Sequence, residues 1–152
     1  MDYPKYNLAV DAEITVFEFK SIGKTVIEKV IKFSPTDNEL VYNLGFGDKH
    51  QSERGFTIDD KSVSNNGDTA MILATIANAV FIFTQYNPDK YVFFSGVTPS
   101  RVRLYRMAIS VNYEELSRNF IIFGIVSGRE GVDVALPFAS NMDVKGFLIK
   151  RK

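Results

Sequence analysis

Three arginines, Arg101, Arg103 and Arg106, lie within six residues of one another in the stretch SGVTPSRVRLYR. Thr98 precedes them and is followed by proline, a pairing that is typical of the first turn of a helix. Successive helical residues differ by about 100°, so Arg103 and Arg106 lie near one another while Arg101 points elsewhere. Hydroxyl groups and guanidinium forks at a helix N-terminus suit phosphate or carboxylate groups. The stretch therefore predicts an anion- or acidic-partner-binding corner made of Thr98, Ser100 and the three arginines.

The same arginines also have a purely structural interpretation. They would then form the solvated face of a helix, or pair with the carboxylates of Asp59, Asp60 or Asp68. No acidic residue lies between Asp89 and Glu114, which makes this stretch the most basic local surface of the chain. The sequence alone leaves both interpretations open.

Two acidic clusters are weaker candidates for chemistry. Asp59 and Asp60 have the residue types of a general base pair or of ligands for a hard cation. No further carboxylate stands at a recognisable spacing, so a polar turn is the favoured interpretation. Asp48, His50 and Glu53 resemble a metal site only loosely, and an exposed loop histidine is favoured there. We therefore expect no bound metal.

Composition sets the class of protein. The chain has 152 residues, which fits a single domain over residues 1–152 with a core of its own. It has no cysteine, which excludes a disulfide scaffold, thiolate zinc sites and a cysteine nucleophile. Eighteen basic and eighteen acidic residues cancel, so bulk charge gives no argument for nucleic acid. Tyr105 and Tyr113 beside the arginines keep nucleic-acid binding open.

The chain also carries no signal for a membrane. Its first residues lack the basic stretch and apolar run of a secretory signal. The longest uninterrupted apolar run covers residues 79–83, far shorter than a membrane span. We expect a soluble, cytoplasmic protein without membrane association.

Apolar periodicity and turn residues predict the elements of the fold. Residues 47–55 are polar and predict a loop, and the return strand 24–33 places Thr25, Ile27, Ile31 and Phe33 on one face. The predicted strands are 14–19, 24–33, 40–46, a short one about 56–58, 91–94 and 120–126, with possible edge strands at 132–136 and 146–149.

Three helices complete the expected fold. The first covers about residues 67–86, with Asn65 or Asn66 as its cap, Asp68 in its first turn and burial on most sides. The second begins at Thr98, and the third is a short helix with a capping box at Asn112. Antiparallel strands followed by helix, strand, helix and strand predict the α+β class, with a mixed and mainly antiparallel sheet in one domain.

Four motifs together resemble a known family. They are YNLGFGD, DDKSVSNNGDT, LAT and SGVTPSRVRLYR, and the similarity runs from about Phe19 to Gly124. The family consists of small bacterial proteins, mainly from Bacteroidetes, and carries a domain-of-unknown-function label. The resemblance implies no settled activity. Small bacterial proteins of this kind are associated with toxin–antitoxin or phage-related modules, which suggests a protein partner.

The order of elements from the second strand onward is similar to that of GCN5-related N-acetyltransferases. In their N-x-x-A-x-x-L-Y motif, Thr98 takes the place of Asn, Arg101 takes the place of Ala, and Leu104 and Tyr105 match. The tyrosine often acts as a general acid in that superfamily, so the resemblance implies this role for Tyr105. Residues 64–68 depart from the family, because they contain one glycine and an acid where a basic, glycine-rich loop holds pyrophosphate. We therefore expect no acetyl-coenzyme A and no other cofactor.

The sequence favours a binding or regulatory protein whose functional corner joins residues 59–68 to the helix 98–106. Its ligand would be a protein partner or a phosphate-containing molecule. The alternative is an acetyltransferase-like enzyme with an altered cofactor loop, and Tyr105, Asp59 and Asp60 are its catalytic candidates. No motif predicts an oligomeric state, and residues 127–152 predict no role of their own.

Overall fold

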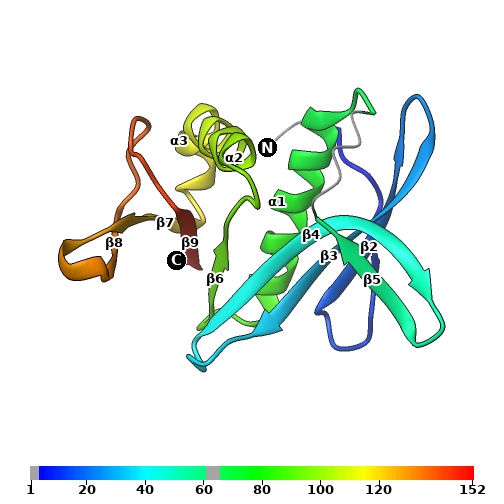
Figure 1. Cartoon of the computed structure of the whole chain (residues 1–152), viewed down its shortest axis with the longest axis horizontal. Helices are drawn as coiled ribbons and strands as arrows, with labels where there is room; N and C mark the ends of the chain where they lie inside the picture. The colour runs from blue at the N-terminus through cyan, green and yellow to red at the C-terminus, as the bar shows by residue number, and fades with distance from the viewer. Residues whose placement is uncertain (1–3, 61–65) are drawn as a thin grey trace. The chain divides into compact units, whose positions relative to one another are not determined.

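The computed structural model describes residues 4–60 and 66–152 (Figure 1). The predicted α+β class is confirmed, with a mixed and mostly antiparallel sheet of nine strands among these residues. In chain order the elements are β1 (Ala9–Val10), β2 (Val16–Ile22), β3 (Val26–Pro35), β4 (Val41–Ser52), β5 (Gly55–Asp59), α1 (Thr69–Tyr86), β6 (Tyr91–Phe94), α2 (Pro99–Val111), α3 (Tyr113–Leu116), β7 (Phe120–Ser127), the 3-10 turn η1 (Arg129–Gly131), β8 (Asp133–Pro137) and β9 (Gly146–Arg151).

The chain forms two compact units, each built from two segments. The first contains Met1–Ser34 and Leu44–Tyr86, and the second contains Pro35–Asn43 and Asn87–Lys152. Strand β4 passes from the second unit into the first. The single domain over residues 1–152 stays a prediction.

In the first unit, β1, β2, β3 and β4 are neighbours in that order, and β5 pairs with β4. The register sets Phe17 opposite Ile31, and both side chains are fully buried. Phe33 lies on the same face of β3, as the alternation predicted, and it stacks on Phe83 of α1 with ring centroids 4.2 Å apart. Burying each such side chain stabilises the fold by about 1.5–3 kcal/mol.

Helix α1 begins two residues later than predicted, and it is buried along one face rather than on most sides. Thr75, Ala79 and Phe83 are fully buried at i, i+4 and i+8, whereas Ile72 and Ile76 are only half-buried. The sequence predicted no segment long enough to span a membrane, and α1 corrects this expectation. Its 18 residues have a mean hydropathy of 1.4 and could cross a membrane by length and composition. One such helix is weak evidence, since the core helix of a soluble protein passes the same test, and the chain is compatible with a soluble protein.

The predicted polar loop at residues 47–55 is wrong. Strand β4 continues to Ser52, turns through Glu53 and Arg54, and returns as β5. Gly47 makes this pairing possible, because a Cβ there would lie 2.4 Å from the carbonyl oxygen of Asp59. Polar residues are tolerated in this hairpin because most of its side chains face solvent.

In the second unit, the first residues of β4 pair in parallel with β6, and the order continues through β9 and β7 to β8. The apolar run 91–94 is a strand as predicted. Strand β8 is an edge strand as predicted, but β9 is not, because it pairs with both β6 and β7. Its Phe147 is fully buried, which explains the apolar sequence of a central strand.

Two of the predicted helix caps have different outcomes. The Thr98 side chain accepts a hydrogen bond from the Arg101 N–H, with proline next in the chain, so this cap is confirmed. The capping box at Asn112 is wrong, although helix α3 exists. The Asn112 amide donates backward to the carbonyl of Ala108 instead, at 2.8 Å, and therefore closes α2 rather than opening α3.

Candidate functional site

A cleft of about 430 Å³ lies at the N-terminal end of α2 in the second unit. Its walls come from the loop before α2, the first turns of α2 and the residues that lead into β9. The lining residues are Ser95, Gly96, Val97, Thr98, Pro99, Val102, Arg103, Arg106, Asp143, Val144 and Lys145.

Close backbone packing holds the loop before α2 in place. A Cβ at Gly96 would lie 2.5 Å from the Cβ of Arg101 and from the backbone nitrogen of Val102, so only glycine permits this approach. The Ser95 hydroxyl donates a hydrogen bond of 2.6 Å to the carbonyl of Lys145. The cleft is thus bordered on two sides by segments that are tied together.

Cations outnumber carboxylates in the lining. Arg103, Arg106 and Lys145 line the cleft together with a single acid, Asp143. One guanidinium nitrogen of Arg106 donates to the carbonyl of Met142 at 2.9 Å, which orients the rest of the group. The Lys145 ammonium lies 2.9 Å from a carboxylate oxygen of Asp133, so part of its charge is balanced within the unit.

Of the predicted corner residues, the structure brings Thr98, Arg103 and Arg106 together. Ser100 and Arg101 belong to the same helix but are not part of the lining. The cleft also contains Ser95 and the residues that lead into β9, which were not predicted. No local motif indicates the latter, because they reach the cleft only through the position of β9 between β6 and β7.

Tyr105 lies outside the cleft lining. Its ring is half-buried and meets Phe94 edge-on, with centroids 5.7 Å apart. Burial raises the pKa of Tyr105, and the nearby charge of Arg101 lowers it by a smaller amount. The phenol is therefore a proton donor rather than a phenolate at neutral pH.

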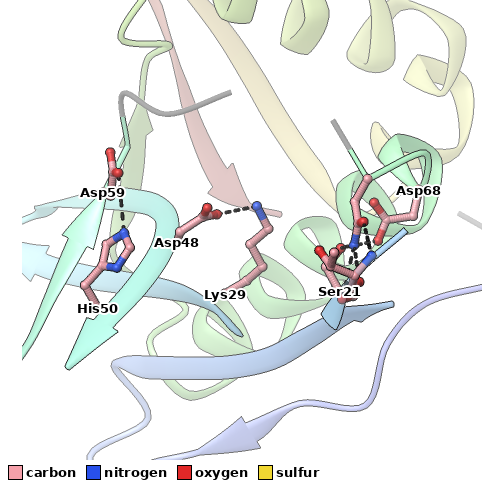
Figure 2. Close-up of polar contacts among 8 residues, drawn as sticks. Ser21, Lys29, Asp48, His50, Asp59 and Asp68 are labelled. Carbon is pink, nitrogen blue, oxygen red and sulfur yellow. Dashed lines mark hydrogen bonds and ion pairs between the residues drawn. The ribbon is translucent and has the colours of Figure 1, made fainter. Parts of the chain in front are cut away.

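In the first unit, the described part of DDKSVSNNGDT is tied to the turn between β2 and β3 (Figure 2). The Asn66 amide donates to the Ser21 hydroxyl at 3.0 Å and to the Thr25 carbonyl at 2.9 Å, and its oxygen accepts from the Thr25 N–H at 3.0 Å. Asn66 is therefore not a helix cap, and Asn65 lies outside the described residues.

Asp68 directly precedes α1, and its carboxylate accepts hydrogen bonds from the hydroxyls of Ser21 and Tyr6, both at 2.5 Å. Burial, followed by the hydrogen bond to Asp68, raises the pKa of Tyr6.

A second polar row crosses β3, β4 and β5 (Figure 2). The Lys29 ammonium pairs with the carboxylate of Asp48 on the neighbouring strand, and both side chains are largely buried. Asp48 stands opposite Asp59 in the register, and His50 Nε2 lies 3.4 Å from an oxygen of Asp59. Lys29 was not among the predicted site residues. It lies on the buried face of β3, two residues from Ile27 and two from Ile31.

We assign no chemical role to the two remaining acidic candidates, Asp59 and Asp60. Asp59 contacts His50, and Asp60 is half-buried at the edge of the described residues. Among residues 4–60 and 66–152, no group of three or more His, Cys, Asp or Glu side chains has the arrangement of a metal site. Residues 59, 60 and 66–68 belong to the first unit and α2 to the second, so the corner that would join them stays a prediction.

Comparison with curated proteins found no match for the chain. Comparison with solved structures also found none. One family model matches residues 2–152, which is nearly the whole sequence. The chain therefore belongs to this family, which is described as a family of unknown function (DUF6934).

Proposed function

We propose that this is a binding or regulatory protein that holds an oxyanion, phosphate or carboxylate, in the cleft at the N-terminus of α2. One observation carries the proposal: Arg103 and Arg106 line the same cleft, with Asp143 as the one acid among the lining residues. We place the protein in the cytoplasm as part of this proposal. The chain has no cysteine, so it has no disulfide that would require an oxidising compartment.

The chemistry of the lining supports an oxyanion. A guanidinium carries several N–H donors in a fixed fork, and the bond from Arg106 to Met142 uses one nitrogen. The N-terminus of α2 adds the positive end of the helix dipole, worth about 0.3–1 kcal/mol for a nearby anion. Hydrogen bonds to charged groups contribute about 1.5–3 kcal/mol each. Two arginines and a helix end therefore give a small oxyanion useful affinity even in an open cleft.

The oxyanion has two sources that share this chemistry. A phosphate-containing small molecule fits a cleft of about 430 Å³, which is in the range of small-molecule sites. A phosphorylated or acidic side chain of a protein partner presents the same group. Isothermal titration separates the two sources, with inorganic phosphate and pyrophosphate in one arm and a phosphoserine peptide in the other.

The test uses Arg106→Ala and the double variant Arg103→Ala/Arg106→Ala, with Arg118→Ala as the control because Arg118 is exposed outside the cleft lining. We expect each cleft arginine to contribute about 10-fold to 100-fold to affinity. Added salt should weaken binding to the wild type. The control should bind as the wild type does. A folded double variant that keeps wild-type affinity would refute the proposal, as would a wild-type protein that binds none of the three probes at millimolar concentration.

An acyltransferase is the second candidate. The succession α1, β6, α2 after antiparallel strands supports it, as does a Tyr105 phenol whose proton is held by burial. Asp68 opposes it, because a carboxylate directly ahead of α1 repels a diphosphate at that helix end. Thermal unfolding with and without acetyl-coenzyme A tests this candidate. A stabilisation that grows with cofactor concentration favours it, and unchanged unfolding removes it.

A further inference from the structure

Helix α2 exposes an apolar stripe on the side opposite its buried face. Leu104, Met107 and Val111 are 38%, 56% and 76% exposed, although a stripe of this kind is normally covered. Their spacing of three and four residues places all three on one face of the helix. Ile109 lies nearly opposite, is only 6% exposed, and holds the helix to its own unit. Folding of the unit therefore uses one face of α2 and leaves the other apolar face open.

The stripe has the pattern of a coiled-coil seam. With Leu104 at position a of a heptad, Met107 takes position d and Val111 the next a. Arg101 and Arg103 then take the preceding e and g positions, which border the seam on its two sides. Charges at e and g decide which helix pairs with such a seam. Both flanking residues at this end of the helix are basic.

We propose that this surface of α2, defined by Leu104, Met107 and Val111 with Arg101 and Arg103 beside it, binds an amphipathic helix of a partner protein. The partner helix carries its own apolar seam, edged by Asp or Glu where it meets the arginines. The apolar contacts supply the attraction, and the charge pairs select the partner and its register.

Two other occupants fit the surface less well. A second copy of α2 would set Ala108 or Ser110 opposite Arg101 and Arg103, so it would offer no acidic group to either arginine. An anionic membrane would attract the arginines, but membrane-surface helices present a wide apolar face with large anchoring residues. The face here is one narrow line without an aromatic residue. An acidic partner helix matches both the width and the charge.

The expected interface is small. Helix α2 has 13 residues and is therefore about 20 Å long, which accommodates roughly two heptads of a partner. Interfaces of this size lie below those of permanent complexes, so we expect a dissociation constant on the order of micromolar. Affinity of this kind suits a regulated contact.

The test uses a synthetic three-heptad peptide with Leu at a and d and Glu at e and g. A second peptide with Lys at e and g has the same apolar seam and the opposite charge. We expect the Glu peptide to bind the wild-type protein and the Lys peptide to bind at least about tenfold more weakly, with the difference reduced by salt. Fluorescence anisotropy of labelled peptides measures both.

The substitution pair Met107→Gln/Val111→Gln replaces two of the three apolar residues of the seam, both at exposed positions. We expect this variant to lose about tenfold or more in Glu-peptide affinity while it binds pyrophosphate as the wild type does. Ile121→Gln, an exposed apolar position on β7 of the same unit, is the matched control and should change neither. Arg106→Ala should show the converse, with weaker pyrophosphate binding and unchanged peptide binding, so the two proposals fail separately.

Four results would overturn the inference. The first is equal binding of the Glu and Lys peptides, and the second is no binding of the Glu peptide by the wild type. The third is binding to vesicles that contain phosphatidylserine, lost in Met107→Gln/Val111→Gln, which would assign the stripe to a membrane. The fourth is self-association of the wild type in sedimentation experiments that the same variant abolishes, which would assign it to a second copy.

Discussion

Lys29 offers the sharpest test of how the first unit is held together. Its side chain is 5% exposed, and the Asp48 carboxylate with which it pairs belongs to a side chain that is 14% exposed. The ammonium also lies 5.8 Å from the centroid of the Phe46 ring. Lys29→Met keeps the aliphatic stem and removes the charge, so Asp48 stays largely buried without the ammonium beside it. Loss of one member of a buried pair costs about 3–5 kcal/mol.

Removal of both charges should behave differently. The double variant Lys29→Met/Asp48→Leu replaces the pair by apolar side chains of similar volume, a change that is often neutral or stabilising. The double variant should therefore be more stable than Lys29→Met alone. A double-mutant cycle that adds Asp48→Leu alone isolates the coupling energy of the pair.

Urea unfolding measures these differences, with far-UV circular dichroism and tyrosine fluorescence as probes, because the chain has seven tyrosines and no tryptophan. The Lys29→Met loss corresponds to a fall in Tm of roughly 6–20 °C for a chain of this length. Glu18→Gln is the matched control, since the Lys49–Glu18 pair lies in the same unit with side chains 14% and 36% exposed. It should cost less than about 1 kcal/mol. If Lys29→Met costs no more than this control, or if the double variant loses the sum of the single losses, the buried-pair reasoning is wrong.

Three further predictions concern other parts of the fold. Asn66→Ala should lower the free energy of unfolding by about 2–4 kcal/mol, because it leaves several buried groups of the β2–β3 turn without their hydrogen bonds, whereas exposed Asn141→Ala should change it by less than about 0.5 kcal/mol. Gly96→Ala should weaken pyrophosphate binding in calorimetry, because its methyl group would meet α2 at 2.5 Å; Gly45→Ala, with its nearest atom at 3.9 Å, should not. Burial raises the pKa of Tyr105 above its ordinary 10.0, so the folded protein keeps a proton that the unfolded chain loses, and stability should fall as pH rises above about 10. Tyr105→Phe should reduce that fall, and an unchanged pH profile would contradict the burial of this phenol.

Local rules predicted most of the elements. The strand 91–94, the Thr98 cap and the long apolar helix follow from patterns that extend over a few residues, and all three are present. The hairpin of β4 and β5 was missed because its polar residues resemble a loop. Only the pairing of the two strands, with Gly47 pressed against Asp59, makes this segment regular.

Long-range arrangement explains the rest of the differences. Strand β9 was expected at an edge, and it lies between β6 and β7 instead. That position brings Asp143 and Lys145 to the cleft, although they are about 40 residues from the arginines in the sequence. Spacing along the chain carries no information about such a contact. The inward-facing lysine of β3 was different, because the alternation of its strand already assigned position 29 to the buried face.

The two units differ in how their distinctive residues are used. Asn66 and Asp68 in the first unit make hydrogen bonds that tie the start of α1 to the sheet, and this accounts for their residue types without a ligand. The exposed side chains of Met107 and Val111 contribute little to folding, because more than half of the surface of each stays in water. Substitution there should therefore change binding and leave stability nearly unchanged, the reverse of what we expect at Asn66. The proposed binding surface on α2 and the DDKSVSNNGDT segment, as far as it is described, would then differ in kind: the first would act in binding and the second in holding the fold together.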